Sequence, residues 1–274
     1  MPELPEVETV RQTLKQLVLG KTINDVTIHW GNIIKQPAEP ESFKRVMIDQ
    51  TLHDIDRMGK FLIFQFDDVH MVSHLRMEGK FAVHPSEEPM KKHTHVIFHF
   101  TDGTELRYND VRKFGTMHAF PKGEERKNKP LTLLGPDPFD PSFTLPYFYE
   151  KVKRTTRSIK AVLLDQSVVA GLGNIYVDET LFRAGVHPER RGKELAEAQV
   201  EAIRIAAIET INEAIQQGGT TIRTYVNSQG QIGMFQQKLY VYGKENEACQ
   251  QCGTLIEKMK HGGRGTHYCR TCQH

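Results

Sequence analysis

The sequence has little that would mark a membrane protein, a secreted protein or a strongly charged one. In its 274 residues no apolar run approaches the length of a membrane span, so we expect no membrane association. The first residues lack the basic segment and apolar stretch of a secretory signal, which predicts a cytoplasmic location. The formal net charge of +2 is too weak to identify a nucleic-acid-binding protein by itself.

Cysteine is scarce as well, and the four cysteines all lie near the C-terminus. Cys249 and Cys252 form one C-x2-C pair, and Cys269 and Cys272 form a second pair after 16 intervening residues. Disulfides are rare in cytosolic proteins, whereas four thiolates at this spacing can close a tetrahedral zinc site. Because four protein ligands leave no open position, we predict one structural zinc ion in a zinc ribbon. We expect no organic cofactor.

The hydrophobic pattern predicts an α+β fold. Apolar residues recur at three- and four-residue steps over residues 1–20, as in an amphipathic helix. Strand patterns follow at residues 23–30, 61–66, 71–77, 95–100 and 105–108. Asp102 and Gly103 between the last two are typical of a tight hairpin. The N-terminal part is therefore predicted to be a helix with a β-sandwich.

A proline-rich boundary separates this part from a helical one. Residues 121–146 carry six of the 13 prolines, which favours a linker. Helical patterns follow at residues 147–152, 158–165, 174–184 and 195–217, and the polar segment 220–237 is predicted to be a loop. We accordingly divide the chain into a helix and β-sandwich domain (1–134), a helical domain (135–237) and a zinc finger (238–274).

The N-terminus offers a candidate nucleophile. Removal of Met1 would expose the secondary amine of Pro2, and a free α-amine has a pKa of about 8, below the value of about 10.4 for lysine. Such an amine can attack a sugar carbon and form an iminium, while Glu3 and Glu6 move protons. An ordinary helix start also explains these residues, because many proteins begin with Met-Pro and carry acids in the first helical turn.

Four other segments could contact nucleic acid. Residues 151–160 hold five basic residues and no acid, although a solvated helix start has the same composition. Between the cysteine pairs, glycines beside Arg264 would let a backbone approach a phosphate, or would simply form a hairpin turn. Segments 74–79 and 110–115 each end a predicted strand with side chains that could wedge into a duplex or pack at the strand end.

Taken together, five separated segments resemble the bacterial formamidopyrimidine-DNA glycosylases, which act as 8-oxoguanine DNA glycosylases and AP lyases. The segments are residues 1–10, 75–79, 110–115, 171–176 and the cysteine module, and they occur in the family's order. The resemblance implies a helix–two-turn–helix element in the helical domain and a monomer that binds damaged double-stranded DNA. It also implies removal of oxidised purines, namely 8-oxoguanine and formamidopyrimidines, followed by strand cleavage through β,δ-elimination.

The resemblance further implies roles for individual residues. Pro2 would be the nucleophile, Glu3 a proton donor, Lys60 an assistant in the first elimination, and Arg264, with Asn174, the holder of the lesion phosphate and an assistant in the second. The residues that would fill the vacated base stack are Met77, Arg112 and Phe114, with Arg112 facing the orphaned cytosine. Further implied DNA contacts are His74, His93, Lys160 and Tyr242, and implied lesion-recognition residues are Glu6, Glu78, Thr224 and Tyr225, with residues 218–237 as a lid. One departure is that Thr155 and Thr156 stand where the family often carries lysine.

Two alternatives remain at this point. Endonuclease VIII has the same fold and prefers oxidised pyrimidines, but Arg112 and Phe114 within R-K-F resemble the purine-specific branch. A non-catalytic zinc-ribbon DNA-binding protein would have no need to keep Pro2, Glu3 and Lys60 together.

Overall fold

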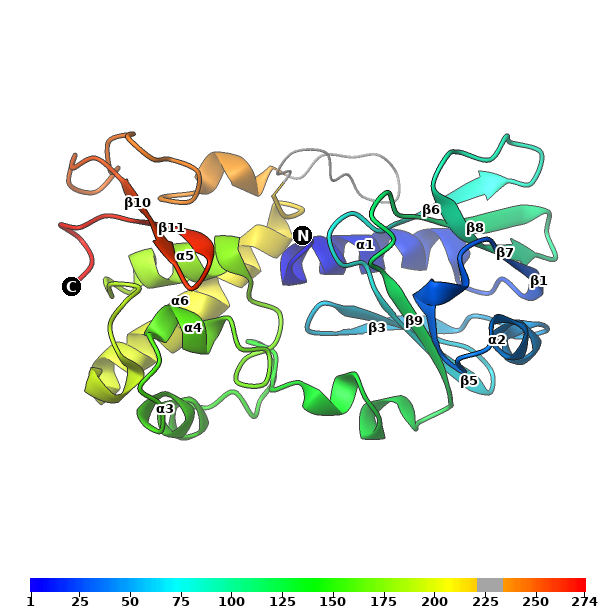
Figure 1. The fold of residues 1–274 in the computed structure, drawn as a ribbon, viewed down its shortest axis with the longest axis horizontal. Coiled ribbons are helices and arrows are strands. Elements are labelled where there is room, and N and C mark those ends of the chain that lie inside the picture. Colours follow the sequence, from blue (N-terminus) through cyan, green and yellow to red (C-terminus); the bar gives the residue numbers. More distant parts are fainter. Residues whose placement is uncertain (221–233) are drawn as a thin grey trace. The chain divides into compact units, whose positions relative to one another are not determined.

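The computed structural model describes residues 1–220 and 234–274, which form two compact units (Figure 1). The N-terminal unit contains Met1–Thr132 and Thr220, and the C-terminal unit contains Leu133–Gly219 and Met234–His274. Within these described ranges, no helix is both long and apolar enough to cross a membrane. The helical segments after residue 133 and the cysteine module fall in the same unit, so the predicted domain boundary at residue 238 stays a prediction.

The N-terminal unit combines one long helix with two sheets. Helix α1 (Leu4–Val18) is followed by a four-stranded sheet in the order β1 (Ile23–Ile28), β7 (Thr94–Phe100), β8 (Thr104–Asn109) and β6 (Lys80–Pro85). The second sheet has the order β2 (Ile34–Gln36), β9 (Thr116–Pro121), β5 (Val69–His74), β4 (Phe61–Gln65) and β3 (Asp54–Met58). A short helix, α2 (Pro40–Met47), joins β2 to β3. The predicted helix and β-sandwich are thereby confirmed.

A single hydrophobic core holds α1 against both sheets. Val7, Val10 and Leu14 from α1 pack in one cluster with Val26 of β1 and Phe64 of β4. Alternation along each strand supplies these inward side chains, because successive residues of a strand point to opposite faces. The helix that carries the N-terminus is therefore fixed by burial on two sheets.

Local backbone geometry confirms one turn and corrects one strand. Gly103 has φ +81°, and the strands on either side of it, β7 and β8, pair antiparallel as the predicted hairpin. The strand expected over residues 71–77 instead ends at His74, because Arg76 adopts φ +54° and leaves the sheet. Residues 75–79 of the predicted wedge segment 74–79 therefore follow the strand as a turn.

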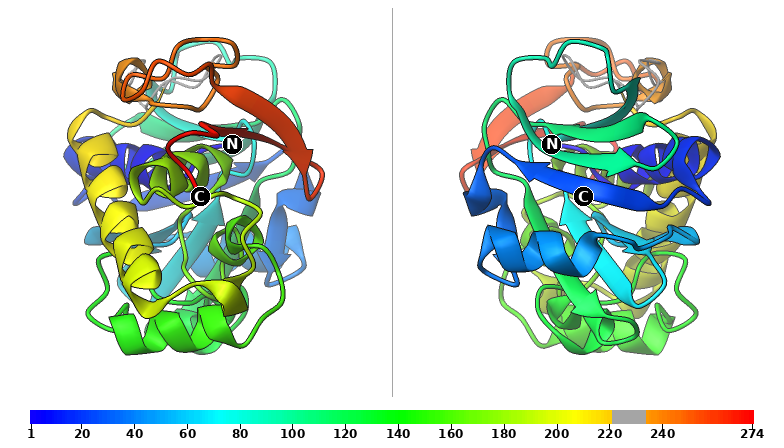
Figure 2. Two further views of the ribbon diagram at one scale, coloured as in Figure 1. Left: turned by 90° about the vertical axis from the view of Figure 1, so that its left-hand side faces the viewer. Right: turned by 90° about the vertical axis from the view of Figure 1, so that its right-hand side faces the viewer.

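The C-terminal unit is helical, with a β-hairpin at its end. Its helices are α3 (Leu145–Lys153), α4 (Ile159–Leu163), α5 (Asn174–Arg183) and α6 (Glu197–Gln216), and its hairpin is formed by β10 (Glu257–His261) and β11 (Arg264–Tyr268). Helix α6 packs against α3 and α5 (Figure 2). All four predicted helices are present. Of the loop predicted over residues 220–237, the described end forms a short 3-10 helix, Phe235–Lys238, and residues 221–233 lie outside the described residues.

Candidate active site and nucleic-acid interface

The start of α1 is organised by a buried carboxylate. Glu3 is the N-cap, and its backbone N–H donates to Glu6 Oε2 at 2.8 Å. Glu6 Oε1 accepts from the backbone N–H and the hydroxyl of Thr220 at 2.8 and 3.1 Å. Pro2, Glu3 and Glu6 are all buried. Glu6 thus has a positioning role at the predicted nucleophile, and its contact with a lesion stays a prediction, as do those of Thr224 and Tyr225, which lie outside the described residues.

A second buried carboxylate ties α1 to the turn that carries Lys60. Glu8 accepts hydrogen bonds from Arg11 and from Arg57, and Arg57 also donates to the carbonyl of Gly59 at 2.9 Å. Burial by itself raises the pKa of Glu8, but hydrogen bonds from Arg11, Gln12 and Arg57 outweigh it and lower the pKa to about 2. Lys60 therefore occupies a fixed position in the β3–β4 turn, with only 5% of its surface exposed.

His74 is a neutral histidine next to this lysine. Burial lowers its pKa to about 3, and the positive charges of Arg76 and Lys60 act in the same direction. Its Nδ1 accepts from the backbone N–H of Arg76 at 2.8 Å, and its ring meets that of Phe61 edge-on at 4.5 Å. His74 consequently supports the turn after β5, and its predicted contact with DNA stays a prediction.

The predicted wedge residues are exposed at the tips of two turns. Met77 is 39% exposed and Phe114 is 52% exposed. The Arg112 guanidinium lies 4.7 Å from the centre of the Phe114 ring, within the range of a cation–π contact. Glu78 lies half-buried in the Met77 turn. These side chains are placed where a ligand can reach them.

The same region concentrates unusual backbone conformations. Arg76, His93 and Lys113 have φ values of +54°, +68° and +59°, a region that side chains other than glycine rarely adopt. Each is, or adjoins, a predicted DNA contact, and His93 is joined to the second turn because its carbonyl accepts from the Asp110 N–H at 3.0 Å. Strained backbone persists where its surroundings enforce it, often at binding sites.

In the C-terminal unit, the structure brings the predicted phosphate-binding residues together. Gly262 and Gly263 have φ +56° and +77°, as a tight two-residue hairpin turn requires, and Arg264 follows, exposed. Asn174, the first residue of α5, donates from Nδ2 to the carbonyl of Gly265 at 2.8 Å. A pocket of about 290 Å³ beside them is lined by Arg157, Lys160, Ala161, Leu164, Asp165, His261, Gly262 and Arg264. Arg157 is paired there with Asp165, which leaves Arg264 as the exposed cation that a phosphate could reach.

Lys160, a predicted DNA contact, lies in a buried ion pair. Its side chain is 1% exposed and its Nζ lies 2.6 Å from Asp178 Oδ1 of α5, while Asp178 Oδ2 accepts from the His267 N–H of β11 at 2.9 Å. A direct phosphate contact would require Lys160 to leave this buried ion pair. In this geometry Lys160 helps to hold the β10–β11 hairpin against α5, and its contact with DNA stays a prediction.

The neighbouring acid, Glu179, holds the segment that leads to the finger. Its carboxylate accepts the backbone N–H groups of Tyr240, Val241 and Tyr242 at 2.8 to 2.9 Å, while burial raises its pKa. Tyr242, a predicted DNA contact, is half-buried with its ring 4.9 Å from that of His267. Sequence reasoning missed Asp178 and Glu179, although two adjacent acids inside an apolar helix pattern were a usable signal.

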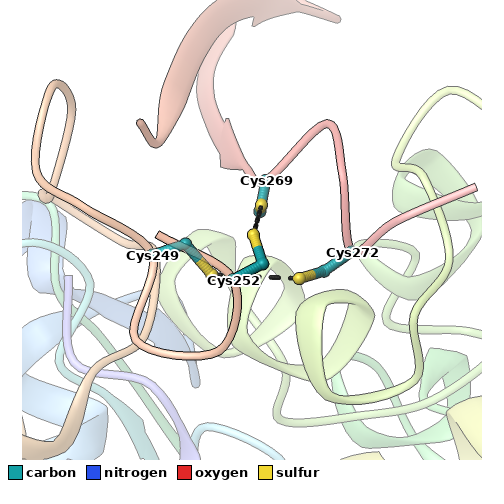
Figure 3. Close-up of side chains that lie close together, drawn as sticks. All are labelled: Cys249, Cys252, Cys269 and Cys272. Atoms are coloured by element: carbon teal, nitrogen blue, oxygen red, sulfur yellow. Dashed lines mark hydrogen bonds between the residues drawn. The ribbon is translucent and has the colours of Figure 1, made fainter. Parts of the chain in front are cut away.

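The four cysteines form a metal site. Their sulfur atoms lie within 4.8 Å of one another, with Cys249 and Cys272 at 3.9 Å and Cys252 and Cys269 at 3.5 Å (Figure 3). A tetrahedral zinc ion with bonds of about 2.3 Å would place its sulfur ligands about 3.8 Å apart. The donor set and its dimensions therefore fit one structural zinc ion, as the cysteine spacing predicts.

Comparison with known proteins agrees with this geometry. Residues 1–117 match the formamidopyrimidine-DNA glycosylase N-terminal domain, residues 134–226 its H2TH domain, and residues 246–274 the zinc finger found in FPG and IleRS. The formamidopyrimidine-DNA glycosylases of Oceanobacillus iheyensis and Bacillus subtilis are 60% and 57% identical over 273 residues, covering 100% of this chain and 98% and 99% of theirs.

Solved structures give the same answer at the level of the fold. A complex of a Lactococcus lactis FPG mutant with DNA containing Fapy-dG has a TM-score of 0.94 and 40% identity, with 99% of each chain covered. A complex of the Lactococcus lactis Fpg with DNA containing an abasic site has a TM-score of 0.92 and 39% identity, again with 99% of each chain covered. The three matched domains and the full-length identity confirm the resemblance, and the chain belongs to the formamidopyrimidine-DNA glycosylase family of DNA-repair enzymes.

Proposed function

We propose that this chain excises 8-oxoguanine and formamidopyrimidines from double-stranded DNA and then cleaves the strand, with Pro2 as the nucleophile. The observation that carries the proposal is the buried N-terminus of α1, where Glu3 caps the helix directly after Pro2. The Lactococcus lactis relatives were solved with DNA containing Fapy-dG or an abasic site, which supports this substrate class.

The chemistry follows from an amine at this position. The Pro2 nitrogen forms a bond to the sugar C1′ as the bond from C1′ to the base breaks, and the base leaves with the bonding electrons and takes up a proton. Glu3 donates a proton to the ring oxygen, which opens the sugar and leaves an iminium on Pro2. Loss of a C2′ proton then expels the 3′ phosphate, and a second elimination expels the 5′ phosphate. Lys60 and Arg264 assist these two eliminations.

Oxidised pyrimidines are the second candidate substrate class. The R-K-F segment favours purines, and the curated relatives are named formamidopyrimidine-DNA glycosylases. We further propose that the chain acts as a cytoplasmic monomer on chromosomal DNA.

Borohydride trapping tests the nucleophile. Reduction during turnover of an 8-oxoguanine:cytosine duplex should link the DNA covalently to residue 2 once Met1 is removed. A variant with one extra residue ahead of Pro2 should lose trapping, because the amine becomes an amide that cannot attack C1′. The adduct is mapped by peptide mass spectrometry. Undiminished trapping in the extended variant would exclude Pro2 as the nucleophile.

A further inference from the structure

The two turns that carry Met77, Arg112 and Phe114 close on one buried side chain. Tyr108 of β8 has no exposed surface. A Cβ added to Gly79 would lie 2.2 Å from the Tyr108 hydroxyl oxygen, and one added to Gly115 would lie 1.7 Å from the same oxygen. Contacts this short cannot exist for real Cβ atoms, so the hydroxyl occupies the space that two side chains would need. Gly79 and Gly115, which end the two turns, therefore both pack against the Tyr108 hydroxyl oxygen.

A buried carboxylate organises the second turn from within. Asp110, which is also fully buried, accepts from the backbone N–H of Arg112 on Oδ1 at 3.0 Å. Its Oδ2 accepts from the N–H groups of Phe114 and Gly115, both at 2.9 Å, and from the Tyr108 hydroxyl at 3.3 Å. Hydrogen bonds to a charged acceptor are stronger than neutral ones, and burial keeps water from replacing them.

These contacts explain how an exposed tip keeps one shape. Residues 111–114 are all exposed, and Lys113 is held at φ +59°, which costs free energy unless the surroundings enforce it. The Asp110 carboxylate supplies that restraint from below, since it binds the N–H groups on both sides of Lys113. Asp110 is further fixed by the His95 side chain, whose Nε2 lies 2.8 Å from the Asp110 carbonyl.

We propose that Tyr108 and Asp110 are positioning residues that set the two turns in register, so that Arg112 reads the base opposite the lesion while Met77 and Phe114 fill the stack. The inference rests on the proposed excision of damaged bases from a duplex. Pre-organised side chains need not be ordered during binding, which preserves the discrimination that a polar contact to a base provides. Loosening either turn should therefore lower opposite-base selectivity without removing the chemistry at Pro2.

Asp110→Asn tests the carboxylate. Asparagine keeps one acceptor oxygen and cannot accept at both former carboxylate positions. We therefore expect hydrogen exchange to accelerate by at least about tenfold at the amides that lose their acceptor, either Arg112 or Phe114 and Gly115. In single-turnover excision of 8-oxoguanine, the preference for cytosine over adenine opposite the lesion should fall by about tenfold, towards the preference of an Arg112→Ala variant, which lacks the reading side chain altogether. Incision of single-stranded DNA with a preformed abasic site needs no wedge and should stay within about twofold of wild type.

Tyr108→Phe tests the hydroxyl and should lower the same preference by about threefold, a smaller loss because only one contact to Asp110 disappears. Tyr147→Phe is its matched control, since that variant removes a hydroxyl bonded to Val168 O at 3.0 Å in the C-terminal unit and should leave the preference unchanged. If Asp110→Asn does not fold, Tyr108→Phe decides by the same two measurements.

The outcomes separate this inference from the proposed function. A wild-type protein that excises no base overturns the proposed function and removes the reading role of Arg112 with it. A folded Asp110→Asn variant with slow amide exchange and an unchanged cytosine preference overturns the inference alone. Equal losses on duplex and single-stranded substrates also overturn it, because they indicate general damage to the active site.

Discussion

Buried carboxylates perform most of the positioning at the scale of single residues. Glu6, Glu8, Asp110, Asp178 and Glu179 are each less than a tenth exposed. Four of them accept backbone N–H groups, and Glu8 accepts from arginine side chains instead. Burying a charge is costly unless hydrogen bonds compensate it, so each of these acids is stabilised by a fixed neighbour that it holds in place.

Glu8→Gln should show this effect as a pH-dependent loss of stability. The depressed pKa of Glu8 stabilises the folded state above the ordinary value of 4.5, and this contribution is lost as the pH falls from there to about 2. The variant should therefore be less stable than wild type by about 2 kcal/mol near neutral pH, where the charged hydrogen bonds to Arg11 and Arg57 are missing.

Urea unfolding at several pH values measures the difference. It should shrink steadily below about pH 4.5, because the wild-type carboxyl becomes protonated and its advantage disappears. Glu209→Gln, a change at an exposed position on α6, serves as the control and should show no such trend. A wild-type advantage that stays constant down to about pH 3 would contradict the assigned role of Glu8.

At the scale of elements, the β10–β11 hairpin packs on α5. Asn174 begins the helix and binds Gly265, and Asp178 one turn later binds Lys160 and His267. Residues four apart lie on the same face of a helix, so a single face of α5 meets the hairpin. This arrangement fixes Arg264 at the hairpin turn relative to the N-terminus of α5.

Lys160→Met should show whether Lys160 helps to hold the β10–β11 hairpin on α5. Losing one partner of a buried ion pair leaves Asp178 uncompensated, which we expect to cost about 3–5 kcal/mol of unfolding free energy. The double variant with Asp178→Asn should lose less than the sum of the single variants. Unfolding by urea measures both.

The salt dependence of DNA affinity separates this role from a direct phosphate contact. If Lys160 only positions the hairpin, the slope of the logarithm of DNA affinity against the logarithm of salt concentration should be the same in Lys160→Met as in wild type. If Lys160 instead binds a phosphate, the slope should decrease by about 1 while the stability stays close to wild type.

For the whole molecule, the two units are stabilised by different interactions. The N-terminal unit is stabilised by the core that joins α1 to both sheets. Around the finger, a small apolar cluster of Phe182, Val241, Cys249, Ile256 and Cys269 packs near the metal site. A cluster of this size is too small to hold the finger by itself, so metal binding must contribute to its folding.

Removal of zinc should therefore affect the two units differently. Cys269→Ser, or chelation of the metal, should unfold the finger and reduce DNA affinity, because Arg264 loses its support. The N-terminal unit should keep its structure, which limited proteolysis and circular dichroism can follow, with zinc content measured by atomic absorption. Full DNA affinity in a zinc-free Cys269→Ser protein would refute this prediction.

Local patterns were enough to identify much of this protein from its sequence. Apolar periodicity located α1, α6 and the other long helices, Asp102-Gly103 located a hairpin, and the cysteine spacing located the metal site. These features depend on neighbours in the chain, whose conformational preferences are written in short segments. The roles expected for Pro2, Lys60 and Arg264 came from the resemblance of the chain's motifs to a known family.

Only the tertiary structure decided what surrounds those residues. Glu6 meets Thr220, Lys160 meets Asp178, and Tyr108 meets Gly79 and Gly115 across distances in the chain that no local pattern encodes. The same holds for the left-handed backbone at Arg76 and Lys113, residue types that do not favour it. Such contacts arise because folding packs distant segments together, and most buried polar groups then find a hydrogen-bond partner wherever the fold supplies one.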